Sequence, residues 1–215
     1  MRNTLIGLAA AAVLIGVVAL LGHFFPGQVP KQVAGPTPQQ VETQDQINKQ
    51  VASVTAGFIG TQDIGPWTLS CPQQAVDDPK DALPGADAVK FVRCRTQLLV
   101  RDSSNVQAVV LGAVVRPVEG SDDLTLILHT PPVSKPGANV IVVLAEKRII
   151  GVRVNSCDKT QCIAIGVLKP VVYKEILAKP GVHVMVSVEK TGQRMYIPMT
   201  TKGLKQSLEA IKRAG

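Results

Sequence analysis

The chain has 215 residues, 46% of them hydrophobic and 18% charged, with 23 Lys+Arg against 16 Asp+Glu. This length fits one ordinary domain plus an appendage, and the apolar fraction excludes a chain that is disordered throughout. A net charge of +7 is compatible with nucleic-acid binding, but aromatic residues make up only 3% and the basic residues are scattered. The composition therefore argues against nucleic acid as a partner.

The start of the chain is long, apolar and almost free of charge. Residues 4–25 (TLIGLAAAAVLIGVVALLGHFF) would span about 33 Å as a helix, and a hydrocarbon core is roughly 30 Å thick. We therefore predict a transmembrane anchor or signal segment over residues 1–25. Its apolar run exceeds the usual 7–15 residues of a cleaved signal, and no Ala-x-Ala site follows. These features favour a retained anchor over a cleaved signal peptide.

The charges around this segment predict its orientation. Arg2 and the amino terminus favour a cytoplasmic start by the positive-inside tendency. The chain would then cross the inner membrane once through residues 4–25 and enter the periplasm after Pro26. If the segment is cleaved, the alternative is a soluble periplasmic or outer-membrane protein.

All four cysteines follow the apolar segment, at Cys71, Cys94, Cys157 and Cys162. An even count is compatible with two disulfides in an oxidising compartment, and four reduced thiols are the alternative. Three pairings are possible; proximity favours Cys157 with Cys162, which leaves Cys71 with Cys94. A zinc site is disfavoured, because no Cys-x-x-Cys occurs and the three histidines are far apart.

Residues 26–62 are predicted to form a Pro/Gln-rich linker that contains a short helix. Pro and Gly at low charge over residues 26–40 are typical of an extended spacer. The spacing of apolar residues over Gln39–Ile59 predicts an amphipathic helix, whose apolar side could pack on the domain or on a partner. The apolar positions are Val41, Ile47, Val51, Val54 and Phe58.

Residues 63–215 are predicted to form a mainly β domain. Short runs rich in Val, Ile, Leu and Thr alternate with Gly, Pro, Asn and Asp, which favours an antiparallel sandwich or barrel. Two helices are expected, over Pro170–Lys179 and Lys202–Lys212, and the second would place Leu204, Leu208 and Ile211 on one face. The predicted strands are Trp67–Cys71, Val89–Val100, Val106–Arg116, Leu124–His129, Asn139–Ala145, Arg148–Val154, Cys162–Leu168, Val182–Glu189 and Arg194–Met199.

No pattern of residues predicts catalysis, a cofactor or a metal. The acidic pairs Asp77-Asp78 and Asp122-Asp123 stand in turn-like stretches, and Ser134 belongs to no nucleophile motif. Trp67, the one tryptophan, is expected to pack against a disulfide inside the domain; exposed contact with a ligand is the alternative. The basic balance of the domain fits anionic headgroups, an acidic partner or simple solubility.

Several segments together resemble the invasion associated locus B family of exported proteins. They are Gly65–Cys71, Cys94–Gln97, Pro136–Val140, Cys157–Ala164 and Met199–Leu204 followed by Leu208–Ile211. The resemblance runs from about Gly65 to Ile211 and implies an immunoglobulin-like β-sandwich in the periplasm or envelope. It also implies that the first two cysteines pair and the last two pair, and it supplies no catalytic residues.

These observations lead to three functional hypotheses. The first is a non-enzymatic, membrane-tethered periplasmic interaction module, an accessory subunit with a protein partner in the inner membrane or envelope. The second is a cleaved and released envelope protein of the invasion-associated type. The third is a thiol-redox protein that uses Cys157 and Cys162, for which Lys159 would supply a nearby positive charge.

Overall fold

The structure is a computed structural model and describes residues 43–73, 92–145 and 148–215. The described helices are α2 (Gln44–Ala52), α3 (Pro170–Leu177) and α4 (Leu204–Ala214). The strands are β1 (Gly60–Ile64), β2 (Trp67–Cys71), β3 (Arg95–Arg101), β4 (Val109–Pro117), β5 (Leu124–Thr130), β6 (Asn139–Ala145), β7 (Arg148–Cys157), β8 (Cys162–Leu168), β9 (Gly181–Ser187) and β10 (Arg194–Thr200).

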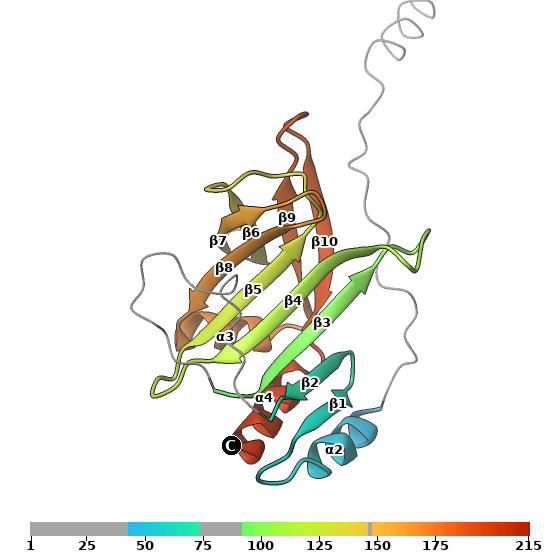
Figure 1. Ribbon diagram of the computed structural model, residues 1–215, viewed down its shortest axis with the longest axis vertical. Helices are drawn as coiled ribbons and strands as arrows, with labels where there is room; N and C mark the ends of the chain where they lie inside the picture. Colours follow the sequence, from blue (N-terminus) through green and yellow to red (C-terminus); the bar gives the residue numbers. More distant parts are fainter. Residues whose placement is uncertain (1–42, 74–91, 146–147) are drawn as a thin grey trace, which may run out of the picture. The chain divides into compact units, whose positions relative to one another are not determined.

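The ten strands form one antiparallel sheet in the order β1-β2-β3-β4-β5-β8-β7-β6-β9-β10. Most neighbours in the sheet are also neighbours in the chain, so hairpins make most of the connections. Figure 1 shows β3, β4, β5 and β8 side by side, with α3 behind them. The predicted antiparallel, mainly β architecture is confirmed.

The immunoglobulin-like arrangement needs correction. An immunoglobulin domain divides its strands between two sheets, whereas here all ten described strands belong to one hydrogen-bonded sheet. The sheet is curled. Trp67 on β2 and Met199 on β10 line the same small internal cavity, although their strands lie near opposite ends of the strand order. One curled sheet, a half-barrel, therefore supplies both layers around the core.

Alternation along each strand separates the inner face from the outer face of this sheet. On β3, Leu98 and Val100 are buried, whereas Leu99 and Arg101 point outward and are exposed. The inner face forms the main core together with the three helices. A second, smaller cluster lies on the outer face and consists of Ile127, Ile163 and Ile165 with Val114.

The last helix closes the concave side of the sheet. Leu204, Leu208 and Ile211 of α4 are buried, as the spacing in the sequence predicted, and α4 contacts β1, β2 and β3. Its N-cap, Gly203, has φ 84°, and a Cβ there would lie 2.6 Å from the carbonyl oxygen of Ile64. Only glycine allows α4 to begin this close to the end of β1.

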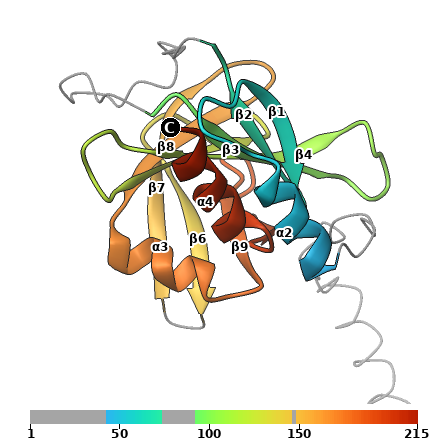
Figure 2. The same ribbon diagram turned by 90° about the horizontal axis from the view of Figure 1, so that it is seen from below.

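Helix α2 packs on its own domain, which was one of the two alternatives left open by the sequence. Ile47 and Val51 are buried in the main core, and α2 contacts α4 and β1. Thr43 and Gln46 form a capping box that begins the helix. Figure 2 shows α4 between α2 and α3.

Several predicted features lie outside the described residues. These are the anchor or signal segment over residues 1–25, the spacer over residues 26–40 and the acidic pair Asp77-Asp78. Within residues 43–73, 92–145 and 148–215, no helix is long and apolar enough to cross a membrane.

Replacing Gly203 with Ala should destabilise the domain by at least about 3 kcal/mol, because left-handed strain adds to a backbone clash. Gly192→Ala is the matched control: its φ is +67° but nothing lies within 4 Å of an added Cβ, so only about 1 kcal/mol is expected. Urea unfolding followed by circular dichroism measures both. Equal losses would contradict the close contact between Gly203 and Ile64.

Candidate functional site

An open groove lies between α3, α4 and the connection from β4 to β5. Pro170 occupies the first turn of α3, where proline fits, and α3 ends before Pro180-Gly181. Ile176 anchors α3 in the core at 3% exposure. Because α3 and α4 both rest on the concave face, they stand next to each other although about 30 residues separate them in the sequence.

The groove has an apolar floor and a charged rim, and its volume is about 450 Å³. Leu124 and Leu208 are buried, and Leu177 is half-buried. The full lining comprises Val92, Pro117, Ser121, Asp122, Leu124, Tyr173, Lys174, Leu177, Lys205, Leu208, Glu209, Ile211, Lys212 and Gly215. We call this site the α3–α4 groove.

Two contacts hold the hairpin wall of the groove in place. The Lys169 ammonium, just before α3, lies 2.7 Å from the Asp123 carboxylate in the β4–β5 connection. The Asp123 side chain is 17% exposed and that of Lys169 is 68% exposed, so this is a surface ion pair, worth at most about 1 kcal/mol. The backbone N–H of Val92 donates to the carbonyl of Pro117 at 3.3 Å, which joins the chain before β3 to the same wall.

The rim carries charges of both signs. Lys174 stands on α3, whereas Lys205, Glu209 and Lys212 follow one side of α4, and Asp122 faces them from the hairpin. All five are exposed. An apolar centre surrounded by polar groups of mixed charge is the usual anatomy of a protein–protein contact. The α3–α4 groove therefore combines an apolar centre with a charged rim.

Both predicted disulfides are present. Cys71 at the end of β2 pairs with Cys94 just before β3, and both residues are buried in the main core. Cys157 at the end of β7 pairs with Cys162 at the start of β8, and the two residues are also register partners in the sheet. The second bridge therefore closes the tip of the β7–β8 hairpin.

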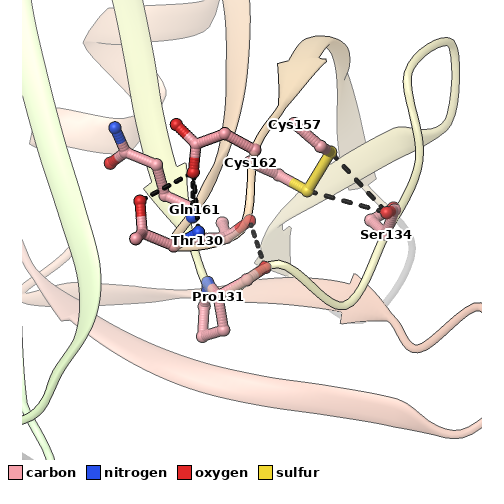
Figure 3. Close-up of a disulfide and its surroundings, with 8 residues drawn as sticks. Thr130, Pro131, Ser134, Cys157, Gln161 and Cys162 are labelled. Atoms are coloured by element: carbon pink, nitrogen blue, oxygen red, sulfur yellow. Dashed lines mark hydrogen bonds between the residues drawn. A yellow bond between two sulfur atoms is a disulfide. The ribbon is translucent and has the colours of Figure 1, made fainter.

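Figure 3 shows the Cys157–Cys162 bridge against a neighbouring loop. Both sulfur atoms lie 3.6 Å from the carbonyl oxygen of Ser134. Within the tip, the carboxylate of Asp158 accepts from the backbone N–H groups of Thr160 and Gln161 at 2.7 and 2.9 Å. Asp158 therefore acts as a local turn-former.

These contacts do not support the thiol-redox hypothesis. A reactive cysteine needs a nearby positive charge and partial exposure to form its thiolate. Here Cys162 is fully buried and Cys157 is half-buried, and both sulfurs lie 3.6 Å from a carbonyl oxygen, which carries partial negative charge. The carbonyl of Ser134 would destabilise a thiolate at either position.

Trp67 is buried as predicted, but its predicted partner is corrected. Trp67 and Cys71 point to the same face of β2, yet four residues of strand separate them by about 13 Å, with Leu69 between them. The ring instead lines a small apolar cavity with residues of β4, β5, β8, β10, α3 and α4. The alternative of exposed ligand contact is contradicted by its 0% exposure.

The remaining polar residues considered in the sequence are not brought together. Asp122 lies on the groove rim and Asp123 pairs with Lys169. His129 donates through Nδ1 to Oε1 of Gln161 at 3.0 Å. In the part of the chain that the structure describes, no group of three or more His, Cys, Asp and Glu residues could hold a metal ion.

The groove residues were missed at the sequence level, although one signal pointed in their direction. The amphipathic pattern of the last helix identified Leu208 and Ile211 as core residues. The sequence did not show that the buried side of α4 would end beside α3. Strand curvature decides that proximity, and it leaves no mark in local spacing.

The arrangement defines a class: an antiparallel β domain with two disulfides and an open groove between surface helices. The chain belongs to the invasion associated locus B (IalB) family, whose model matches residues 67–212. The fold is also similar to the crystal structure of invasion associated protein B from Bartonella henselae, with a TM-score of 0.54 at 15% identity. That match covers 71% of this chain and 95% of the other. No curated protein matches.

The two disulfides should contribute unequally to stability. In the chain-entropy model, replacing Cys71 and Cys94 with Ala costs about 3.4 kcal/mol for a sequence separation of 23, and replacing Cys157 and Cys162 costs about 2.1 kcal/mol for a separation of 5. Urea unfolding of both double variants measures this difference. A larger loss at the Cys157–Cys162 pair would show that the hairpin tip, and not loop closure, dominates.

Proposed function

We propose that this protein is a non-enzymatic interaction module of the cell envelope, tethered to the inner membrane by residues 4–25 with its domain in the periplasm. In this proposal it serves as an accessory subunit, and a protein partner of the envelope binds in the α3–α4 groove. The family match and the two disulfides support an oxidising envelope compartment. The apolar segment at residues 4–25 supports the tether.

The α3–α4 groove is the observation that carries this proposal. Its floor exposes part of the main core between two helices, and its volume of about 450 Å³ fits a few side chains of a partner. The lysines on the rim would pair with carboxylates of that partner, and Asp122 and Glu209 would set its register. Apolar anchors in the centre would supply most of the binding free energy.

If the tether is retained, protein isolated from native membranes should keep its original amino terminus. Carbonate washing should leave the chain in the membrane pellet, because an apolar helix is not extracted by high pH. Sequencing from the amino terminus after that wash tests the point. A mature start close to Gln28 would instead establish the released form.

If the groove binds the partner, Lys174→Glu combined with Lys205→Glu should reduce co-purification in mild detergent by about tenfold, equivalent to 1.4 kcal/mol. Both lysines are exposed, so the fold should be unaffected. Quantitative mass spectrometry of the captured proteins measures the effect.

The matched control reverses the charge of two exposed lysines that do not line the groove, in the double variant Lys159→Glu with Lys190→Glu. The control changes net charge equally and should leave capture unchanged. Equal loss in both variants would assign the effect to net charge and would exclude the groove as the contact.

A further inference from the structure

The outer face of the sheet has a charge pattern unlike the rest of the domain. Five adjacent strands, β3, β4, β5, β8 and β7, contain no Asp, Glu or Lys. Every charged residue in them is an arginine: Arg95, Arg101, Arg116, Arg148 and Arg153. Among the described residues, the carboxylates lie in helices, in loops and on β1.

Register places Arg101 and Arg153 on either side of an apolar centre on the outer face. Arg153 is paired with Ile165, Ile165 with Ile127, and Ile127 with Val114, so these side chains form one row across the outer face. A neighbouring row joins Leu99, Gly112, His129 and Ile163. Arg101 and Val109 form the edge of the same face, where β3 ends and β4 begins. Figure 1 looks onto these strands.

Parts of this face are open to solvent. Leu99 is 46% exposed, Val109 44% and Val167 41%, and Arg101 and Arg153 are also exposed. Arg116 is buried and is not available for contact. Arg101 lies four strands away from Arg153 in the sheet and four residues farther along the strand direction. Standard strand spacing and rise then place the Cα atoms of the two arginines about 23 Å apart along the sheet. A contact that uses both must therefore be broad and carry several anionic groups.

We infer that this arginine face lies against the anionic phospholipid surface of the membrane to which the domain is tethered. Arginine binds phosphate through two parallel N–H bonds, and exposed aliphatic residues between arginines favour the interface between headgroups and acyl chains. The absence of carboxylates from the five strands removes repulsion from such a surface.

The inference rests on the proposed tether, which keeps the domain near its target. The α3–α4 groove uses residues of the concave side and of the hairpin, not the outer-face residues named here. Membrane contact and partner binding can therefore occur together.

The test places the full chain in nanodiscs of phosphatidylcholine alone or with 40% phosphatidylglycerol. Phenylglyoxal, which modifies exposed arginines, is then applied and the modified residues are quantified by mass spectrometry. Labelling of Arg101 and Arg153 should fall at least threefold in the anionic discs and recover in 0.5 M NaCl. Labelling of Arg194 and Arg213, which are exposed on β10 and α4, should not change.

A second readout follows the apolar residues. Carbene labelling of Leu99 and Val167 from solvent should fall in anionic discs. The double variant Arg101→Gln with Arg153→Gln should lose this protection. The double variant Arg194→Gln with Arg213→Gln, which changes the net charge equally, should keep it. Near-ultraviolet circular dichroism verifies that all variants are folded.

Three outcomes would overturn the inference. Equal labelling of all four arginines in both discs would exclude membrane contact through this face. Equal protection in neutral discs would exclude recognition of charge and would indicate contact with another protein or a second copy. Protection by inorganic phosphate in neutral discs, to the same degree as by phosphatidylglycerol, would indicate a site for the free ion.

Failure of the tether would be visible separately. A chain that does not enter nanodiscs would contradict the proposed anchor and leave the face to be tested on its own. The same labelling, carried out with anionic and neutral vesicles added to that chain, would then decide the inference by the same criteria.

Discussion

The contact between α4 and the first three strands is the constraint on which the rest of the structure depends. Leu204, Leu208 and Ile211 fill the concave side of a sheet whose ends would otherwise expose their inner faces. This contact requires a helix that starts directly above the carbonyl of Ile64, and only Gly203 permits that start. Without α4, the hydrophobic core would lose one wall and the groove would lose one side.

The two disulfides act at different scales. Cys71–Cys94 links β2 to the chain just before β3, across a long polar segment whose ends it holds within the core. Cys157–Cys162 closes a hairpin tip that Asp158 already shapes through backbone hydrogen bonds. The first bridge mainly lowers the conformational entropy of the unfolded chain, and the second fixes the shape of the β7–β8 hairpin tip. Neither bridge has the surroundings of a reactive thiol pair.

Local patterns predicted the strands well where a short apolar run lies between turn residues, and poorly where the strand contains few apolar residues. The predicted bounds of β2, β6 and β8 match those of the structure, because each is a short run of β-branched or other apolar residues between turn residues. Strand β1 was not predicted, since Ile64 is its one buried residue and the edge position needs few apolar side chains. The groove was not predicted, because its walls come from Pro117, Lys174 and Lys205, far apart in the chain.

The sequence alone determined the antiparallel, mainly β class, the helix positions, the two cysteine pairs and the membership in the family. These features follow from spacing and from neighbours along the chain, where a few residues decide each outcome. Only the tertiary structure decided that one curled sheet supplies both layers around the core, that α3 and α4 form a groove, and that Arg101 and Arg153 share one face. The physical reason is that strand twist accumulates over ten strands, and pairwise register, not local composition, sets which residues meet.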